Sequence, residues 1–414
     1  MKQLGRMEGN GDVRPPKRKR YSVNTEVEQQ PHKIRRGRVE FETETLTREP
    51  GPSLSTRFQA LSPLSRRHRK PQQSRDERES SRQWAFSPCN SSTSTYKDKF
   101  VVVSYNILGV ENASKHPDLY YKVPPRFLEW GRRKKLIRKE INRYNASIMC
   151  LQEVDRFDDL AHLFQKDGFE GVYKSKQNQL ESEITPQTSV SPCTQNRSVV
   201  IGNTHVLFNP NRGDIKLGQV RLFLEKAHEL SQEWGSIPVI ISGDLNSIPQ
   251  SPMYQFLASS ELDIRLHNRR HISGQVDSGS ENISFRSQNG KASRCSIRKY
   301  ISRPSQYIWN EEEVRLATGI EGATRLQHHL KLCSAYLGVP GSCRTRDRCG
   351  EPLATSYHSK FMGTVDYIWH TEELVPVRVL ETLPVNILRR NGGLPSKKWG
   401  SDHLALVCEL AFRK

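Results

Sequence analysis

The sequence predicts an α/β fold for residues 99–414, and two observations lead to this prediction. Short runs of apolar and β-branched residues, such as Val101-Val102-Val103, have the length and composition of buried strands. Longer segments between these runs repeat apolar residues at helical spacing. Strands that alternate with helices in this way form sheets whose faces are covered by helices.

The expected elements follow from these patterns in chain order. Strands are predicted at residues 100–103, 146–151, 198–205, 238–242, 364–369 and 403–410. Amphipathic helices are predicted at residues 126–144 and 217–230, with further helical patches between 310 and 335. Ser251 and Pro252 mark the start of another helix, because serine is a favoured N-cap and proline fits the first helical position.

Composition separates this domain from the residues before it. The 414 residues contain 64 Lys and Arg against 45 Asp and Glu, a net charge of +19, and only 35% are hydrophobic. Residues 1–98 lack apolar periodicity and are rich in Ser, Gln, Pro and Arg, so we expect a disordered basic tail. Its basic clusters at 17–20, 33–38 and 66–70 are typical of a solvated tail, a nuclear-import signal or an RNA-tethering arm. A second polar stretch, about 267–360, is expected to be an insertion or mobile surface loops.

Several function classes do not fit this composition. No run of 18 apolar residues is present, and residues 1–20 lack the apolar segment of a secretory signal, so no membrane association is expected. Eight scattered cysteines indicate reduced thiols in an intracellular protein. The positive charge favours a polyanionic partner, with nucleic acid first, and we expect the protein in the nucleus and cytoplasm.

Polar side chains stand where the expected strands begin or end. They are Asn106, Glu153, His205, Asp244, Asn246, Asp366, Asp402 and His403. Any one of them alone is commonly a turn former or a surface residue. Gathered at one rim, four carboxylates would repel each other unless a cation lay among them. Because hard oxygen ligands suit Mg²⁺ or Mn²⁺, the pattern predicts a divalent metal site.

The short sequence motifs around these residues resemble those of a known family. Ser104-Tyr105-Asn106, Leu151-Gln152-Glu153-Val154, Asn203-Thr204-His205, Gly243-Asp244-Leu245-Asn246, Val365-Asp366-Tyr367 and Ser401-Asp402-His403 occur in the order seen in the endonuclease/exonuclease/phosphatase superfamily. Phe361-Met362-Gly363 and Pro210 resemble its carbon catabolite repressor 4-type deadenylases, particularly the plant members. The resemblance covers about residues 99–414 and implies a four-layer α/β sandwich with two mixed β-sheets packed face to face.

The resemblance implies metal-binding roles for three residues. Glu153 would be the principal Mg²⁺ ligand, and Asn106 would help to position that metal and the phosphate. Asp402 would bind or stabilise a second metal. Such ions neutralise the charge that develops during phosphodiester hydrolysis and help to generate hydroxide.

The same resemblance implies the catalytic groups. Asp244 would orient and deprotonate the attacking water, and Asn246 would hold the phosphate or the nucleophile. Asp366 would orient His403, which would contact the phosphate as its charge grows. His205 would be another phosphate contact.

Two further residues would bind substrate. Phe361 and Pro210 resemble residues that sandwich the terminal adenine of the substrate. An aromatic platform suits a single-stranded nucleic acid, because every base has a π-face that can stack. The alternative for Phe361 is a place in the core, which is common for an aromatic residue beside a strand.

The sequence departs from the family pattern between Glu153 and His205. These two residues are closer together than in family members, which place further strands and an Arg-Asn-containing phosphate motif between them. Residues 175–196 are rich in Gln, Ser, Thr and Pro, a composition that we do not expect to replace a sheet segment. We interpret the region near 175–197 as an internal deletion, which predicts a less stable and less active chain.

Three functions are compatible with this sequence. The leading one is a Mg²⁺-dependent 3′-to-5′ exoribonuclease that shortens mRNA poly(A) tails and releases AMP. The alternatives are another phosphodiesterase or phosphatase of the same superfamily, and a catalytically impaired RNA-binding isoform. The expected partner is poly(A) RNA. Residues 1–98 show no leucine-rich repeat, so the sequence gives no support for recruitment to a deadenylase complex through such a surface.

Overall fold

The computed structural model describes residues 81–88, 96, 98–173, 183–189, 197–275 and 308–413. All of them lie in one compact unit, Lys70–Lys414. Residues 1–80 of the expected basic tail, with its three basic clusters, lie outside the described residues. Among the helices within these ranges, none is long and apolar enough to cross a membrane.

Two five-stranded mixed sheets form the centre of the unit. The first has the order β1-β13-β14-β2-β3, formed by Trp84–Phe86, Leu374–Leu380, Leu406–Phe412, Lys99–Asn106 and Ile148–Gln152. The second has the order β4-β5-β6-β12-β9, formed by Glu183–Ser189, Arg197–His205, Val239–Asp244, Asp366–Thr371 and Leu332–Ser334. The pairs β2–β3 and β5–β6 are parallel and the other neighbours are antiparallel.

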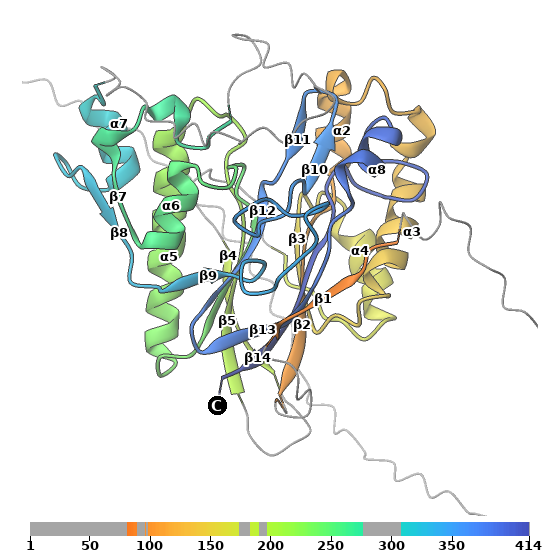
Figure 1. Ribbon diagram of the computed structural model, residues 1–414, viewed down its shortest axis with the longest axis horizontal. Helices are drawn as coiled ribbons and strands as arrows, with labels where there is room; N and C mark the ends of the chain where they lie inside the picture. Colours follow the sequence, from red (N-terminus) through yellow and green to blue (C-terminus); the bar gives the residue numbers. More distant parts are fainter. Residues whose placement is uncertain are drawn as a thin grey trace, which may run out of the picture. The chain divides into compact units, whose positions relative to one another are not determined.

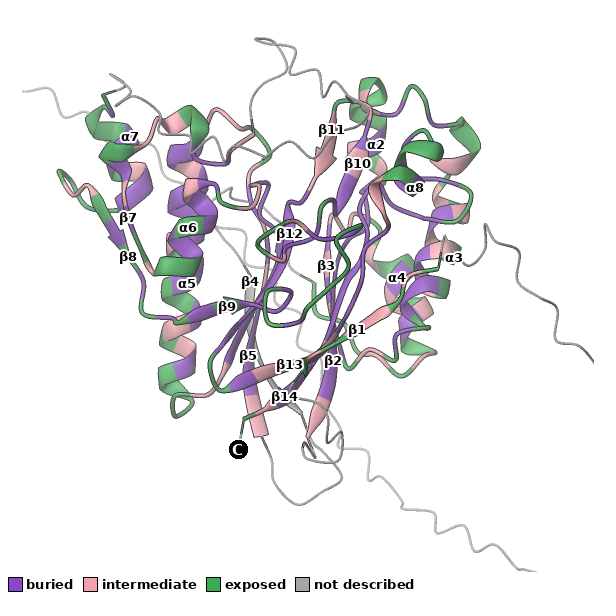
Figure 2. Ribbon diagram, in the orientation of Figure 1, coloured by how far each residue is buried: buried purple, intermediate pink, exposed green. Residues whose placement is uncertain are grey.

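The sheets pack face to face between two layers of helices (Figure 1). Val102 and Cys408 of the first sheet share a buried core with Ile240 and Ile368 of the second. Helices α3 (Trp130–Ile141) and α4 (Phe157–Gln165) cover the other face of the first sheet. Helices α5 (Gly213–Glu233), α6 (Pro252–Ser259) and α7 (Glu311–Thr318) cover the other face of the second. The predicted four-layer α/β sandwich is confirmed, and its strands are largely buried (Figure 2).

The helices form where the sequence patterns favour them. In α5 the residues Leu217, Val220, Leu224 and Ala227 form one buried stripe against the second sheet. Helix α6 begins as expected, with Ser251 accepting a hydrogen bond from the Tyr254 N–H and proline in the first turn.

Shorter elements complete the unit. The other helices are α2 (Val110–Lys115), η2 (Pro117–Leu119), η3 (Pro125–Phe127), η4 (Ile264–Leu266), η5 (Arg269–His271) and α8 (Val385–Arg390). Two further antiparallel pairs are β7 (Glu261–Asp263) with β8 (Arg325–Gln327) and β10 (Ser356–His358) with β11 (Phe361–Gly363).

The folded part begins earlier than the expected boundary at residue 98. Strand β1 pairs antiparallel with β13, with Trp84 opposite Leu380. Arg82 donates hydrogen bonds to the carbonyls of Glu381 and Ala405, and it forms a buried ion pair with Glu140. Local composition did not reveal this strand, because its stability comes from partners some 300 residues away in the chain.

The region near 175–197 also differs from expectation. Strand β4 pairs antiparallel with β5 over seven residues, from Glu183 opposite Asn203 to Ser189 opposite Arg197. This segment therefore covers the edge of β5 despite its polar composition, because backbone groups alone supply the ladder of a strand. Residues 174–182 and 190–196 lie outside the described residues.

Much of the expected polar insertion belongs to the domain. Residues 276–307 lie outside the described residues, but 308–360 contribute α7, β8, β9 and β10. Trp309, Val314, Leu326 and Tyr336 are buried in the two sheet cores. The region is polar on average because its elements are short and each buries only a few side chains.

The Arg82–Glu140 pair yields a test of where the fold begins. We expect Arg82→Met to lower the free energy of unfolding by about 3–5 kcal/mol, because the variant leaves the buried Glu140 carboxylate without its cation. Urea unfolding followed by circular dichroism measures this change. Arg315→Met is the matched control, because its ion pair with Glu312 is exposed and such pairs contribute little. Equal stabilities of the two variants would contradict the prediction.

The outer edge of β3 yields a second prediction. In the described part of the chain β3 pairs only with β2, and apolar side chains beside it, among them Met149 and Phe164, line a cavity. An unpaired edge and an incomplete core lower stability. We expect thermal unfolding at a lower temperature than in a relative that has the additional strands, with more binding of a hydrophobic dye. A sharp transition at the relative's temperature would rule out the predicted instability.

Candidate active site

The strand directions bring the expected site residues to one rim of the sandwich. The parallel strands β2 and β3 end at Asn106 and Gln152, the residue before Glu153. The parallel strands β5 and β6 end at His205 and Asp244, which are register partners. Strand β12 runs the opposite way, so its first residue, Asp366, lies opposite Asp244. Each sheet therefore supplies part of the same cluster.

His403 reaches this rim from the segment before β14. The expected last strand began at residue 403, but β14 begins at Leu406. The Ser401 hydroxyl donates to the carbonyl of Asn106 at 2.7 Å and accepts from the His403 N–H at 3.2 Å. These bonds tie the loop that carries His403 to the end of β2.

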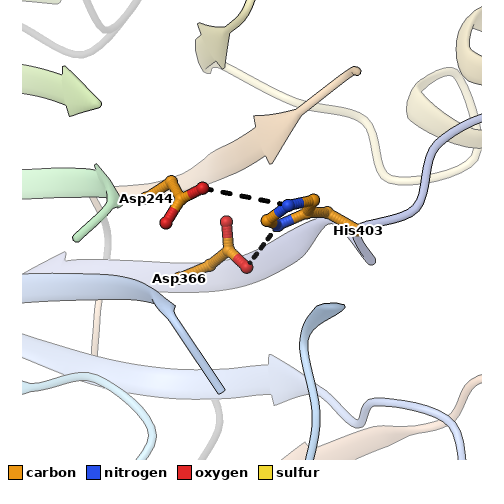
Figure 3. A group of neighbouring side chains, drawn as sticks. All are labelled: Asp244, Asp366 and His403. Carbon is orange, nitrogen blue, oxygen red and sulfur yellow. Dashed lines mark hydrogen bonds and ion pairs between the residues drawn. The ribbon is translucent and has the colours of Figure 1, made fainter. Parts of the chain in front are cut away.

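Asp366, His403 and Asp244 form the buried centre of the site (Figure 3). The Nδ1 of His403 lies 2.8 Å from Oδ2 of Asp366, and its Nε2 lies 3.8 Å from Oδ2 of Asp244. Burial by itself would lower the pKa of His403, but the carboxylates of Asp366, Asp402 and Asp244 raise it well above the usual value. The surrounding carboxylates therefore favour the imidazolium form of His403, whose Nε2 faces Asp244 across the site.

Glu153 and Asp244 lie on either side of Asn106. The Nδ2 of Asn106 donates to Oε1 of Glu153 and to Oδ2 of Asp244, both at 3.0 Å. The other Glu153 oxygen accepts from the Gly109 N–H and from Asn112 Nδ2, both at 2.9 Å. Asn106 thus turns its amide nitrogen toward the carboxylates. In this orientation it holds them in place rather than offering an oxygen to a metal.

Glu153 is ionised despite its burial. Burial would raise its pKa, but the nearby His205 and the N–H donors of Asn106, Gly109 and Asn112 bring the pKa below the usual value. Its backbone has a φ of 59°, a left-handed conformation that costs a non-glycine residue on the order of 1 kcal/mol. This strain is consistent with a side chain placed for function rather than for stability.

His205 faces both carboxylates. Its Nε2 lies 3.9 Å from Oε1 of Glu153 and 3.6 Å from Oδ2 of Asp244. The structure thus brings His205 into the same cluster as Glu153 and Asp244.

The turn after β6 fixes Asp244. Gly243 has a φ of 139°, and a Cβ atom there would lie 1.9 Å from the carbonyl oxygen of Thr204, so only glycine fits. The Asn246 N–H donates to Oδ1 of Asp244 at 2.8 Å, and the Asn246 side-chain amide donates to the carbonyl of Val206 at 3.0 Å. Asn246 therefore holds Asp244 through its backbone and ties the two strand-end loops together through its side chain.

Asp402 lies in the site beside Tyr120. The Tyr120 hydroxyl donates to Oδ2 of Asp402 at 2.8 Å. Burial and the charge of Asp402 raise the pKa of Tyr120 above the usual value, so the hydroxyl keeps its proton. In this arrangement Asp402 acts electrostatically on its neighbour His403, whose pKa it helps to raise.

A cavity of about 1580 Å³ opens over the cluster. Phe361 and Pro210 both line it, as does the exposed Phe208. The ring of His358 lies 5.9 Å from the ring of Phe361, and burial lowers the pKa of His358, which keeps that ring neutral. The cavity thus carries an apolar aromatic wall beside its charged floor.

The donor set fits a hard divalent cation at Glu153. Glu153 is an ionised, nearly buried carboxylate, and Asp244 shares with it the same Asn106 nitrogen. Such oxygen donors suit Mg²⁺ or Mn²⁺. Asp366, His403 and Asp244 also have ligand atoms within 4.8 Å of one another, but their carboxylates favour the imidazolium form of His403, which has no lone pair to offer a metal. Glu153, with Asp244 nearby, is therefore the better metal-binding end of the cluster.

The sequence patterns did not reveal several residues that support the site. Thr355 accepts hydrogen bonds from the N–H groups of Val365 and Asp366, and Tyr120 and Asn112 bond to site carboxylates. These three residues lie in loops or short helices without a recognisable pattern. Lys216 could have been noticed, because its spacing places it on the same helical face as the buried Val220 and Phe223.

Comparisons with known proteins agree with this geometry. Residues 103–403 match the Endonuclease/Exonuclease/phosphatase family. Carbon catabolite repressor protein 4 homolog 5 of Arabidopsis thaliana is 49% identical over 444 aligned positions, covering 96% of this chain and 95% of the relative. Homolog 3 of the same plant is 43% identical, covering 76% and 75%. The first alignment is longer than this chain of 414 residues, so that relative has residues without a counterpart here.

A solved structure extends the comparison to three dimensions. The crystal structure of ANGEL2, a 2′,3′-cyclic phosphatase, in complex with adenosine-2′,3′-vanadate has a TM-score of 0.60 and 26% identity, covering 80% of this chain and 99% of that one. Enzymes of the matched family depend on divalent metal ions. Because the family match spans both sheets and a relative is 49% identical along nearly its whole length, this chain belongs to the endonuclease/exonuclease/phosphatase family of hydrolases, among its carbon catabolite repressor 4-like members.

Proposed function

We propose that this protein is a Mg²⁺-dependent 3′-to-5′ exoribonuclease that shortens poly(A) tails and releases AMP. The observation that supports this most strongly is the single rim where the carboxylates of Glu153 and Asp244 meet the His403 ring beneath an aromatic-walled cavity. Such a site offers a cation-binding carboxylate, a proton acceptor and a donor to phosphate oxygens, which are the groups that phosphodiester hydrolysis requires.

In the proposed mechanism each of these residues has one role. Asp244, held by the Asn246 N–H, accepts a proton from the attacking water. Protonated His403, oriented by Asp366, donates to a phosphate oxygen as negative charge builds there. The water oxygen bonds to phosphorus and the phosphorus–O3′ bond breaks. The shortened RNA keeps O3′, which takes up a proton from solvent, and AMP leaves with its 5′ phosphate. Glu153 would hold Mg²⁺, which supplies charge neutralisation and a more acidic water when bound.

The aromatic wall supports adenine as the terminal base. Phe361 and Pro210 face the same cavity, where the two could hold a base between them. The structurally similar ANGEL2 was crystallised with an adenosine derivative, which is consistent with an adenine at the corresponding end of a substrate. The net charge of +19 favours a polyanionic RNA partner. We accordingly propose poly(A) RNA as the partner, with the protein acting in the nucleus and cytoplasm.

A second candidate activity is hydrolysis of a 2′,3′-cyclic phosphate at an RNA end. The structural similarity to ANGEL2, a 2′,3′-cyclic phosphatase, favours this activity. The mouse 2′,5′-phosphodiesterase 12, 27% identical, points to phosphodiester chemistry more broadly. A catalytically impaired RNA-binding form is a third candidate, because the outer edge of β3 is unpaired in the described residues. Parallel assays with oligo(A), oligo(U) and RNA ending in a cyclic phosphate separate the three.

The metal-binding carboxylate yields the first test of the proposal. We expect wild-type protein to release AMP from oligo(A) in Mg²⁺ and to lose this activity in EDTA. Glu153→Gln should reduce kcat by about 10²-fold or more, because a bound metal supplies several kcal/mol of transition-state stabilisation. Glu312→Gln, an exposed carboxylate on α7, is the control and should retain full activity. AMP release that is insensitive to EDTA would contradict the metal-dependent mechanism.

The aromatic wall yields the second test. Phe361→Ala should raise KM for oligo(A) by about 5- to 100-fold, because loss of one base-stacking contact costs about 1–3 kcal/mol. Phe86→Ala removes an exposed phenyl ring from β1 that does not line the cavity, and it should leave KM unchanged. Steady-state kinetics on oligo(A) and oligo(U) measure both effects. An unchanged KM in Phe361→Ala would place that ring outside the substrate site.

A further inference from the structure

Lys216 is a buried cationic side chain for which the mechanism above has no role. It lies in the first turns of α5, is 0% exposed, and ranks among the largest fully buried side chains of the described residues. Burial lowers its pKa to about 7, against the opposing influence of Asp244. Burying an amine is costly unless its polar atom is bonded, so a purely structural position would favour an apolar residue.

The amine has a specific partner. Its Nζ donates to the main-chain oxygen of Asn246 at 2.8 Å, and no carboxylate of the described residues forms an ion pair with it. A neutral amine also has N–H donors, so this hydrogen bond can form in either protonation state, although the charged form donates more strongly. The bond joins α5 directly to the turn that follows β6.

That turn is strained and needs an external support. Asn246 has a φ of 45°, a left-handed conformation that costs on the order of 1 kcal/mol for a residue other than glycine. The N–H of Asn246 donates to the Asp244 carboxylate, and its side-chain amide donates to the carbonyl of Val206, directly after β5. The strained backbone of Asn246 and the buried amine of Lys216 are each unfavourable alone. The hydrogen bond between them offsets part of both costs.

We propose that Lys216 is a positioning residue of this hydrolase, which holds the carbonyl of Asn246 and thereby keeps Asp244 aimed at the attacking water. The expected effect on kcat rests on the proposed hydrolytic function. The expected effect on the position of the turn after β6 does not. The positioning role predicts that loss of the amine affects the chemical step more than substrate binding, because the aromatic wall at Phe361 and Pro210 does not involve Lys216.

The test compares Lys216→Met with Lys226→Met in the full-length protein. Both residues lie on α5, but Lys226 is exposed and pairs with Glu229, so it is a matched control. In Lys216→Met we expect kcat on oligo(A) to fall about 10²-fold, because small misplacement of a reacting group has effects of this size. KM should stay within about threefold, since only transition-state stabilisation is lost. Hydrogen exchange should accelerate at residues 244–247 and not elsewhere in the domain.

The outcomes separate this inference from the proposed function. A kcat within about threefold of wild type in Lys216→Met overturns it, as does unchanged hydrogen exchange at residues 244–247. A loss of kcat with faster exchange throughout the domain also overturns it, because that pattern indicates general destabilisation. If wild-type protein hydrolyses no phosphodiester, the proposed function fails and the exchange measurement alone decides the role of Lys216. Should Lys216→Met not fold, Lys216→Gln takes its place, and failure of both to fold assigns the residue a structural role only.

Discussion

The site depends on the hydrogen bonds and the positive charge that hold several buried carboxylates close together. Glu153 and Asp244 each lie 3.0 Å from the Asn106 nitrogen, and Asp366 and Asp402 complete the ring around His403. Their mutual repulsion is offset by amide and backbone N–H donors and by the imidazolium that they stabilise. This arrangement leaves an excess of negative charge at Glu153 and Asp244, which favours a divalent cation at that end; a bound cation would in turn attract a phosphate.

The cluster exists only because two sheets are packed with the same rim aligned. The first sheet contributes Asn106, Glu153 and His403, and the second contributes His205, Asp244 and Asp366. The Asp366–His403 pair therefore joins the two sheets. The shared apolar core of the two sheets therefore sets the distances in the site. Arg82 helps to keep the first sheet in place, because it links Glu140 of α3 to the carbonyl of Ala405, the residue directly before β14.

The unpaired side of β3 connects stability with substrate access. The cavity above Glu153 continues past Phe157 and Phe164, so the catalytic floor is open toward an apolar region. Water that enters this region raises the local dielectric and weakens electrostatic contacts. The relative that aligns over 444 positions has residues that this chain lacks, and a fuller sheet edge would close such a region.

The sequence by itself determined the elements whose information is local. Apolar runs, helical stripes, the Ser251 cap and the polar residues after strands all follow from side chains close together in the chain, and the family resemblance named every residue of the cluster. The tertiary structure alone decided that Trp84–Phe86 and Glu183–Ser189 are strands, that Asn106 presents nitrogen to both carboxylates, and that Lys216 reaches Asn246. These features depend on backbone ladders and hydrogen bonds between segments far apart in sequence, whose energies do not appear in any local pattern.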